Sequence, residues 1–567
     1  MNIAFRILKT PLLILVLVII SSIINHRSSF SDAQVVYVSV DNGVYDFLER
    51  LSLKQVINLD DEVKPYSRVY IAQKLSEIRK HNEKLNSVET DELAFYLQEY
   101  KYEYEKLSPR QARTDNRQAR TENGEITSRW FLYSYEDSLF NLKFSPIAGY
   151  GLSSEDGNSG HTRWVGASVF ATYSDWFGLS FNIRDKGEFG ENVDRNKYFS
   201  PLTGAWYKGA PNGIEYSDLR GGINFNWDWG SISLLKENIQ WGHGKFGQLI
   251  LSSKPPSYPY IRFSIKPVEW LRFTYIHGWL NSLVKDSSYT YYTYPGTISQ
   301  RLVENYIPKY IAANLITVSP LNWLDVSAGN AIVYSGDLRP EFFIPFMFYK
   351  FLDHNTGRGN VNDGNGMIYF DVSAKYPENF QFYSTAFIDV TEVRNILSND
   401  FKNTWVGFTL GGKSVNALID NLDVTIEYTR LNPWVYEHKD EVTTYKHIKY
   451  YLGHWLGQNA DQLRLQFDYQ LLRGLKFKAF AERIRKGALD EIYYAYKEYD
   501  TKNFPFLYSP LRTENRFGLD INYEYMHDLF LRGTFTYSDI NDEDIIRTQQ
   551  FLLGKKSSFL LSLYYGL

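Results

Sequence analysis

The sequence predicts an outer-membrane β-barrel of about 18 antiparallel strands, preceded by a small α-helical domain. Three observations lead to this fold class. The chain opens with an export-type segment, apolar residues then recur with helical spacing to about residue 107, and from about residue 126 apolar and polar residues alternate. The alternation reaches the last residue, with apolar side chains at every second position: Phe559, Leu561, Leu563, Tyr565 and Leu567.

Residues 1–33 are expected to be a signal peptide. Arg6 and Lys9 precede an apolar run from Leu12 to Ile20, which is shorter than the roughly 20 residues that a helix needs to cross hydrocarbon. Ser-Asp-Ala at 31–33 supplies the small-x-small spacing of a cleavage site. An uncleaved N-terminal anchor is the alternative. The chain has no cysteine, so it is neither a lipoprotein modified on cysteine nor a disulfide scaffold.

Residues 34–107 are predicted to form a helical domain on the periplasmic side. Four apolar residues fall at i, i+3, i+4 and i+7 and so share one helical face: Val44, Phe47, Leu48 and Leu51. A second amphipathic helix follows the candidate cap Ser67, and a third follows Ser87. Because short helices bury such stripes only against each other or against something larger, we expect a bundle docked on the inner face of the barrel.

Residues 108–125 contain a tandem heptapeptide. Arg-Gln-Ala-Arg-Thr-Asp-Asn at 110–116 is followed by Arg-Gln-Ala-Arg-Thr-Glu-Asn at 117–123. The repeat is polar and has no hydrophobic stripe, so it is interpreted as a solvated linker. A basic interaction arm is the alternative, although two acidic residues partly offset the four arginines.

Residues 126–567 carry the alternation expected of the barrel. Residues 223–229 alternate in this way, and runs such as 517–525 extend over about nine or ten residues, as in tilted membrane strands, whereas strands of soluble sheets average five or six. The mean hydropathy of -0.36 fits a barrel, because only alternate residues face lipid. The aromatic content of 17%, with 45 Tyr and 13 Trp, fits interfacial girdles.

The remaining composition limits the partners and locates the connections. The net charge is -4, and removing three basic and one acidic residue with the signal peptide makes it -6, so nucleic acid is not an expected partner. The longest stretches without alternation are predicted to be external loops, at about 186–220, 284–300, 353–366, 435–458 and 487–512.

One stretch is more specific than general barrel sequence. It reads Lys-Glu-Asn-Ile-Gln-Trp-Gly-His-Gly over 236–244, Leu-Ile-Leu-Ser over 249–252 and Tyr-Ile-His-Gly over 275–278. It resembles the capsule assembly Wzi family of outer-membrane proteins, with the family-type residues Glu237, Asn238, Trp241, Gly242, His277 and Gly278. Further similar segments lie at 45–51, 64–68, 310–315, 331–334, 344–346, 427–430 and 452–461.

The resemblance covers nearly the whole mature chain. It implies a barrel of about 18 strands in the outer membrane of a Gram-negative-type bacterium, with its helical domain on the periplasmic side. It also implies a surface lectin for capsular or exopolysaccharide, and not an enzyme. The expected partners are this polysaccharide, outer-membrane lipid and, during biogenesis, the barrel assembly machinery. Leu567 departs from the Phe or Trp with which barrel proteins usually end.

No motif indicates catalysis, a metal or a cofactor. The glycines at 242, 244 and 247 have dinucleotide-motif spacing, but a strand-like run follows them where that site needs a helix. Neither H-E-x-x-H nor G-x-S-x-G is present. His447 and His454 give only a weak metal spacing, and the oxygen-rich loop at 353–363 lacks the Glu of a calcium loop. We therefore predict no catalytic residue, no metal and no cofactor.

Sugar binding requires flat apolar faces with polar groups beside them, which Tyr and Trp provide. Two predicted external loops concentrate these residues, and lysines in the second could pair with the carboxylates of an acidic glycan. The alternative is that the rings belong to the aromatic girdle at the membrane surface. The glycan-binding candidates are Tyr289, Tyr291, Tyr292, Trp434, Tyr436, Lys439, Tyr445, Lys446, Tyr450 and Trp455.

The leading hypothesis is an outer-membrane protein that binds capsular or exopolysaccharide at the cell surface and assists capsule assembly or attachment. The alternative is a porin or substrate-specific channel, because polar residues expected to face inward could line a pore: Asp228, Glu427, Arg464 and Asp468. An outer-membrane hydrolase is a third hypothesis, for which the sequence offers no motif.

Overall fold

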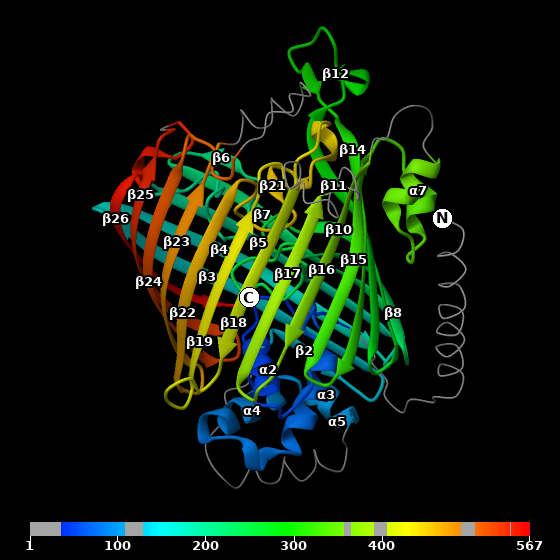
Figure 1. Ribbon diagram of the computed structural model, residues 1–567, viewed down its shortest axis with the longest axis vertical. Coiled ribbons are helices and arrows are strands. Elements are labelled where there is room, and N and C mark those ends of the chain that lie inside the picture. The colour runs from blue at the N-terminus through cyan, green and yellow to red at the C-terminus, as the bar shows by residue number, and fades with distance from the viewer. Residues whose placement is uncertain are drawn as a thin grey trace.

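The computed structural model describes residues 36–107, 129–356, 364–389, 405–488, 505–544 and 546–566. Within these residues the chain forms a closed barrel of 18 antiparallel strands, in which the last strand pairs with the first (Figure 1). The predicted barrel and its strand number are confirmed. The predicted signal peptide and the tandem heptapeptide lie outside the described residues.

The barrel strands follow one another around the wall in chain order. Two short strands, β2 (Tyr133–Glu136) and β6 (Lys208–Ala210), add to the edges of β3 and β7. The 18 strands of the closed wall are β3 (Phe140–Glu155), β4 (Asn158–Tyr173), β5 (Phe177–Gly190), β7 (Gly213–Trp227), β8 (Gly230–Glu237), β10 (Tyr258–Val268), β11 (Leu271–Lys285), β14 (Tyr306–Leu321), β15 (Leu324–Ser335), β16 (Asn365–Ala374), β17 (Phe380–Asp389), β18 (Trp405–Ser414), β19 (Leu422–Leu431), β22 (Ala460–Leu472), β23 (Leu475–Lys486), β24 (Arg512–Met526), β25 (Leu529–Asp542) and β26 (Gly554–Tyr565).

The period-two pattern determines which side chains face outward. In β26, Phe559, Leu561 and Leu563 are exposed on the outer wall, whereas Ser562 between them is buried. The same arrangement in β24 exposes Phe517 and Leu519. Because these outward apolar residues recur on strand after strand, the wall presents the hydrophobic belt that a membrane barrel needs.

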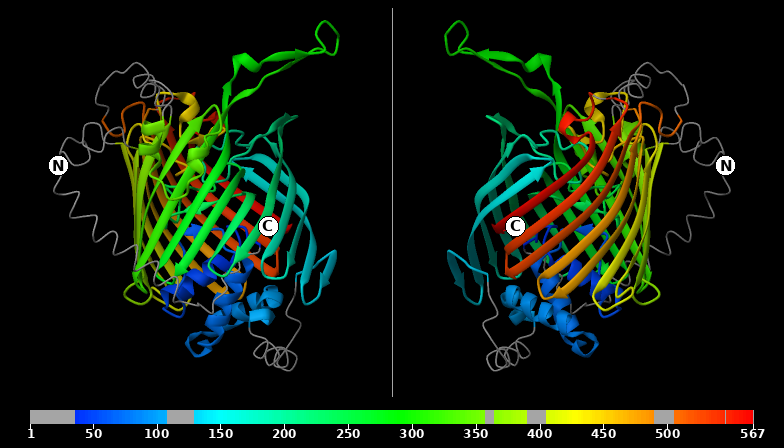
Figure 2. Two further views of the ribbon diagram at one scale, coloured as in Figure 1. Left: turned by 90° about the vertical axis from the view of Figure 1, so that its right-hand side faces the viewer. Right: turned by 90° about the vertical axis from the view of Figure 1, so that its left-hand side faces the viewer.

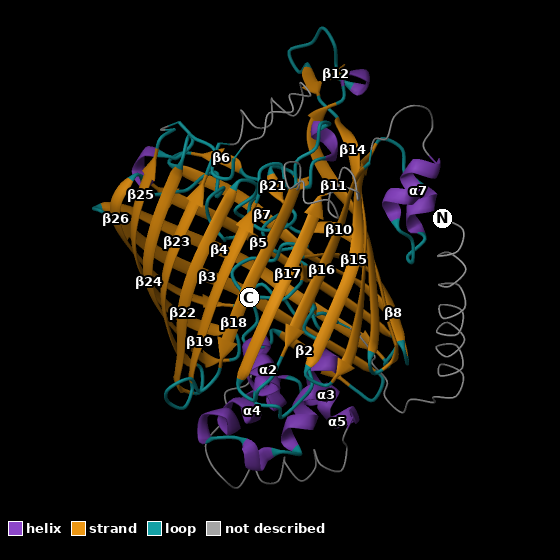
Figure 3. Ribbon diagram, in the orientation of Figure 1, coloured by secondary structure: helices purple, strands orange, loops and turns teal. Residues whose placement is uncertain are grey.

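The two ends of the barrel differ in the length of their connections. At one end the strands are joined by short turns: 174–176, 228–229, 269–270, 322–323, 375–379, 415–421, 473–474 and 527–528. Most of the connections at the other end are long: 191–212, 238–257, 286–305, 336–364, 390–404, 432–459, 487–511 and 543–553. Figure 3 shows the N-terminal helices at the end with the short turns, which we call the helical end; the opposite end is the loop end.

The second predicted helix begins after its predicted cap Ser67, whereas the third is capped by Asn86 and has Ser87 as its first helical residue. Ser67 accepts a hydrogen bond from the Tyr70 amide at 3.0 Å, and Asn86 and Glu89 form a reciprocal capping box. The predicted third helix divides at Tyr100, whose backbone is not helical. The helices are α2 (Val44–Leu53), α3 (Arg68–Arg79), α4 (Ser87–Glu99) and α5 (Lys101–Leu107), and they share one apolar core.

The helical domain is attached to the helical end through ion pairs and ring contacts with strand ends and turns. In Figures 1 and 2, α2 reaches into the barrel while α3, α4 and α5 lie below it. Arg50 of α2 pairs with Asp423, and the ring of Phe95 stacks on His527 with centroids 3.5 Å apart. Among the described residues, no helix has both the length and the apolar character required to cross a membrane.

Three segments enter the lumen: 54–67 from the helical end, and 238–257 and 432–459 from the loop end. The first two meet as a small sheet, because β1 (Val63–Lys64) pairs with β9 (Gln240–Trp241). With inward residues of the wall they form one buried apolar cluster on the side of β10–β19. We call these three segments the plug.

Candidate functional site

The loop between β11 and β14 extends far from the barrel as a two-stranded hairpin (Figure 2). It contains β12 (Tyr291–Thr293) and β13 (Arg301–Val303), and its base is closed by an ion pair of 2.6 Å between Lys285 and Glu304. All four of its tyrosines are more than half exposed: Tyr289, Tyr291, Tyr292 and Tyr294. The prediction of an external loop at about 284–300 agrees with this placement, and three of the glycan-binding candidates lie here.

The second predicted loop, 435–458, lies within the connection 432–459, which folds into the lumen. The hydroxyl of Tyr436 donates to the Leu249 carbonyl at 2.6 Å, and that of Tyr445 to the Ile250 carbonyl at 2.7 Å. The interpretation of 435–458 as an external loop is wrong, because the polar ends of its rings hold two plug segments together. Five glycan-binding candidates are therefore buried and not at the surface: Trp434, Tyr436, Tyr445, Tyr450 and Trp455.

The two candidate lysines of this segment are placed differently from the rings. Lys439 is exposed at the loop end, whereas Lys446 is half-buried and pairs with Glu437 at 2.9 Å. Two of the four polar residues expected to line a pore do not line open space in the lumen. Glu427 accepts from the Lys245 amide at 2.6 Å inside the plug, and Asp228 lies in an exposed turn at the helical end.

The family-type residues Glu237, Asn238, Trp241 and Gly242 lie where the plug meets the wall. Trp241 is fully buried, and the Gly242 amide donates to the Glu62 carbonyl at 2.9 Å. Gly242 has φ +98°, which favours glycine, and a Cβ there would meet Asp371 at 3.3 Å. These positions therefore shape the turn that brings segment 238–257 against the N-terminal segment. His277 and Gly278 lie outside the plug, on β11.

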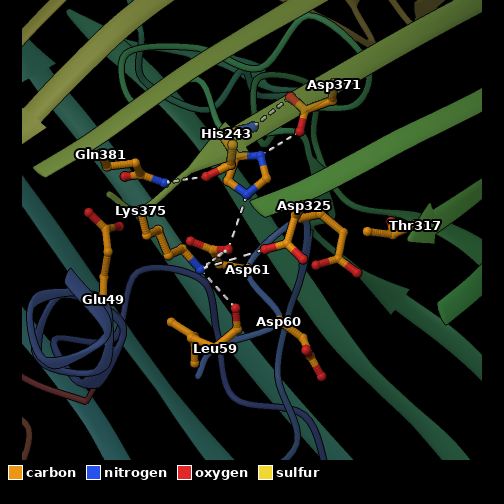
Figure 4. A network of polar contacts seen from close by, with 12 residues as sticks. Glu49, Leu59, Asp60, Asp61, His243, Thr317, Asp325, Asp371, Lys375 and Gln381 are labelled. Atoms are coloured by element: carbon orange, nitrogen blue, oxygen red, sulfur yellow. Dashed lines mark hydrogen bonds and ion pairs between the residues drawn. The ribbon is translucent and has the colours of Figure 1, made fainter. Parts of the chain in front are cut away.

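His243, the next residue, is buried between two carboxylates (Figure 4). Its Nδ1 contacts Asp371 and its Nε2 lies 3.1 Å from Asp61, while Lys375 contacts Asp61 at 2.7 Å. Burial opposes the charged imidazole, but Asp371 and Asp61 outweigh it and raise the pKa of His243 to about 10. The plug is thus fixed to the wall of β16 by a charged histidine.

Further ion pairs fasten the N-terminal segment to the inside of the wall. Arg272 of β11 contacts Glu62 at 2.6 Å and Asp325 at 2.8 Å. Lys413 of β18 contacts Glu49 of α2 at 2.7 Å. Sequence reasoning missed these residues and the His243 site, because their partners lie far away in the chain. Asp61 and His243 are separated by 182 positions, and no local pattern reports such a pair.

The other side of the lumen is hollow. A cavity of about 1190 Å³ lies between β22–β26 and β4–β8. It extends from Leu202 and Trp206 near the loop end to Asp46 and Glu524 near the helical end. Its walls carry acidic, basic and hydroxyl side chains. One of the basic residues, Lys186, has no ion pair with any described residue.

The described part of the chain contains no group of three or more His, Asp or Glu residues placed to hold a metal ion. After the glycines at 242–247 the chain forms an isolated β-bridge between Leu251 and Trp241 and then enters β10. A dinucleotide site would need a helix in this region.

A closed barrel with an apolar outer wall and a lumen partly filled by its own chain defines a plugged outer-membrane β-barrel protein. The sequence model of one family, described as capsule assembly protein Wzi, matches residues 221–551. Since this is more than half of the chain, the protein belongs to that family. The resemblance found in the sequence is confirmed.

Solved structures with a similar fold include the Wzi outer-membrane protein of Escherichia coli. It is 13% identical, the match covers 94% of this chain and 100% of that one, and the TM-score is 0.53. OprD of Pseudomonas aeruginosa is 11% identical over 78% of this chain and 99% of its own, with a TM-score of 0.40. OccAB2 of Acinetobacter baumannii is 11% identical over 74% and 98%, with a TM-score of 0.39. Curated protein sequences give no match.

Proposed function

We propose that this protein is a surface lectin that binds capsular or exopolysaccharide at its loop end and assists in assembling or attaching the capsule. The observation that carries the proposal is the family match over residues 221–551. The similar Escherichia coli structure is described as a carbohydrate-binding β-barrel involved in group 1 capsule assembly. The proposed role is binding without catalysis.

The proposal places the helical end in the periplasm and the loop end outside the cell. Short turns at one end and longer connections at the other are the arrangement of bacterial outer-membrane barrels, in which the short turns are periplasmic. The outward residues of β26 support recognition by the barrel assembly machinery, and the belt of which they are part would contact outer-membrane lipid.

Within the loop end, the hairpin is the proposed glycan contact. Because successive residues of a strand face opposite sides, Tyr291 and Tyr292 present rings on both faces of the hairpin. Exposed Arg301 lies on the same element and could pair with an acidic sugar. Such shallow contacts bind weakly one at a time, and a long polymer engaging many copies would strengthen them.

The test measures retention of the host polysaccharide by the full protein in detergent. Replacing Tyr291 and Tyr292 together by Ala is expected to weaken binding about thirtyfold, because each ring contributes on the order of 1 kcal/mol of stacking. Tyr133→Ala is the matched control, since this tyrosine is equally exposed but lies in β2 at the helical end. Wild-type protein that retains no polysaccharide would overturn the lectin proposal, and equal binding by all three proteins would exclude the hairpin.

A diffusion channel is the second candidate function, and the cavity in the hollow half favours it. Its lining connects residues near both ends of the barrel. Single-channel recording in planar bilayers separates the two functions. The lectin proposal expects no steady conductance from the full chain, whereas an open level that persists at constant voltage would support the channel.

A further inference from the structure

The connection between β15 and β16 leaves the loop end and folds back over the outside of the barrel. Its described part contains a short helix, η3 (Pro340–Phe343), and α7 (Tyr349–Thr356). Figure 1 shows α7 outside the wall, beside β15. We call residues 339–356 the outer strap. It covers part of the surface that elsewhere faces lipid, so the prediction that residues 353–366 form an external loop does not hold for the residues up to 356.

The wall beneath the outer strap breaks the apolar pattern of the barrel. One row of directly paired, outward-facing residues crosses eight strands from β8 to β18, and it is apolar except at two adjacent asparagines. In order, the row is Ile232, Phe263, Tyr275, Asn314, Asn330, Ile368, Ile388 and Val406. Two unpaired amides in a lipid-facing row would each cost several kcal/mol, on the order of a lost hydrogen bond in hydrocarbon.

The outer strap supplies the partners of these amides. Asn314 donates to the carbonyls of Pro345 and Met347, both at 2.9 Å. Asn330 donates to Asn314 at 2.8 Å and accepts from the Tyr349 amide at 2.9 Å. The two asparagines therefore bind the backbone of the outer strap and are shielded by it.

Aromatic residues also pack between the outer strap and the wall. Phe342 and Tyr349 of the outer strap are fully buried against the wall, and Tyr275 donates to the Phe342 carbonyl at 2.8 Å. The family-type residue His277 also faces outward here. It contacts the Tyr334 hydroxyl at 2.8 Å, and its ring lies 4.0 Å from that of Phe343. Three segments that carry the family resemblance thus meet at this contact: 310–315, 331–334 and 344–346.

Between residues 344 and 351, the side of the outer strap that faces away from the barrel is apolar. The exposed residues of this stretch are Ile344, Phe346, Met347 and Phe351, and Phe346 and Phe351 are both more than 60% exposed, whereas the exposed polar residues His354 and Asn355 lie at the C-terminal end of α7. Phe346 stacks on Phe273 at 4.2 Å. Phe273 belongs to a second outward row with Ile265 and Ile316, one step closer to the helical end. The free face is therefore continuous with the apolar belt and lies at its depth.

We propose that the outer strap is immersed in the membrane, with its free face contacting lipid acyl chains. The asparagine pair anchors the outer strap to the wall. Phe346 and Phe351 of the outer strap then provide the apolar, lipid-facing surface that the two asparagines do not provide. The outer strap then acts as a lipid-docking element on an otherwise uniform barrel. This inference concerns the membrane side of the protein and is independent of the proposed glycan binding.

The test uses single-cysteine variants, which are unambiguous because the chain has no cysteine of its own. Spin labels at Phe346→Cys and Phe351→Cys are measured in the full protein in dioleoylphosphatidylcholine vesicles, with molecular oxygen and a water-soluble nickel chelate as relaxing agents. Leu519→Cys on β24 is the lipid-facing control, and Ile298→Cys at the fully exposed hairpin tip is an equally apolar control in water. Oxygen concentrates in hydrocarbon, so the oxygen-to-nickel ratio at both strap positions is expected to match that at 519 and to exceed that at 298 about fivefold.

Ratios at 346 and 351 equal to that at 298 would overturn the proposal, because the outer strap would then face water. Protection from both agents, or spin coupling between copies, would also overturn it in favour of a covering protein. A second variant, Asn314→Leu with Asn330→Leu, should leave the barrel folded and make the label at 346 more mobile. Unchanged mobility in that variant would contradict the anchoring role of the asparagines.

Discussion

The two halves of the lumen are made from the same kind of strand and differ in what lies between the walls. Along β10–β19, inward residues pack with the plug into one apolar cluster. Along β22–β26 and β4–β8, inward residues are mostly charged or hydroxylic and line a cavity of about 1190 Å³. The outer faces of both halves are apolar. Strand alternation therefore determines the outer surface, while segments inserted from the two ends determine the lumen.

This difference shows where the barrel is stabilised from inside. The filled half contains buried ion pairs that join the plug to a wall strand or turn: His243 with Asp371, Arg272 with Glu62, and Lys375 with Asp61. In the hollow half, Lys186 has no such partner among the described residues. Matched substitutions in the two halves should consequently have unequal effects on the stability of the folded protein.

The largest expected effect comes from a pair of tryptophans, one in each half of the lumen. Trp241→Ala removes a fully buried ring from the filled half and should lower the free energy of unfolding by about 3–5 kcal/mol. Trp164→Ala, whose ring lines the cavity, should lower it by about 1 kcal/mol. Urea titration in detergent micelles, followed by the mobility of unheated samples in gels, measures both. Equal losses would remove the distinction between the two halves.

Two lysines test the same contrast for charge. Lys375→Met leaves Asp61 with one partner instead of two, and it should lower the free energy of unfolding by about 2–3 kcal/mol. Lys186→Met in the hollow half should change it by about 0.5 kcal/mol or less. The same urea titration applies. A larger loss for Lys186→Met than for Lys375→Met would show that the cavity charges, and not the plug contacts, support the barrel.

The comparison also separates what the sequence predicts from what it does not. The outer wall could be predicted because lipid imposes one requirement on every strand, which residues such as Phe517 and Leu561 meet at fixed spacing. The start of α3 after Ser67 follows from local capping, and so does the start of α4 at Ser87, after Asn86. These features depend only on neighbours in the chain, so a single sequence contains them.

The lumen and the site could be predicted only in part. The tyrosine-rich hairpin was recognisable because it lacks alternation, whereas the aromatic residues of 432–459 have the same composition and are buried. Tyr289 and Tyr445 cannot be told apart by residue type, because the difference lies in a carbonyl almost two hundred positions away that accepts from Tyr445. Burial of an inserted segment depends on such distant partners.

Alkaline pH should weaken the filled half selectively. The pKa of His243 is about 10 in the folded protein and 6.5 without its partners, so between these values the native state binds a proton that the unfolded state does not. Its contribution is complete below pH 6.5 and is lost as the pH rises through about 10. From pH 7 to pH 9 the wild type should lose about 2–3 kcal/mol more than His243→Gln, which cannot titrate there. Parallel pH profiles of the two proteins would contradict the charged state of His243.

The smallest expected effect compares a buried with an exposed tyrosine. Tyr445→Phe removes the hydroxyl that donates to the Ile250 carbonyl at 2.7 Å and should lower the free energy of unfolding by about 1 kcal/mol. Tyr292→Phe, in the exposed hairpin, should leave the free energy of unfolding unchanged, since the Tyr292 hydroxyl is exposed and makes no hydrogen bond with any described residue. Polysaccharide retention should respond in the opposite sense, with a loss only for Tyr292→Phe. If Tyr445→Phe impaired retention while the urea midpoint stayed constant, the buried tyrosines would belong to the binding site after all, and the division between plug and surface would have to be redrawn.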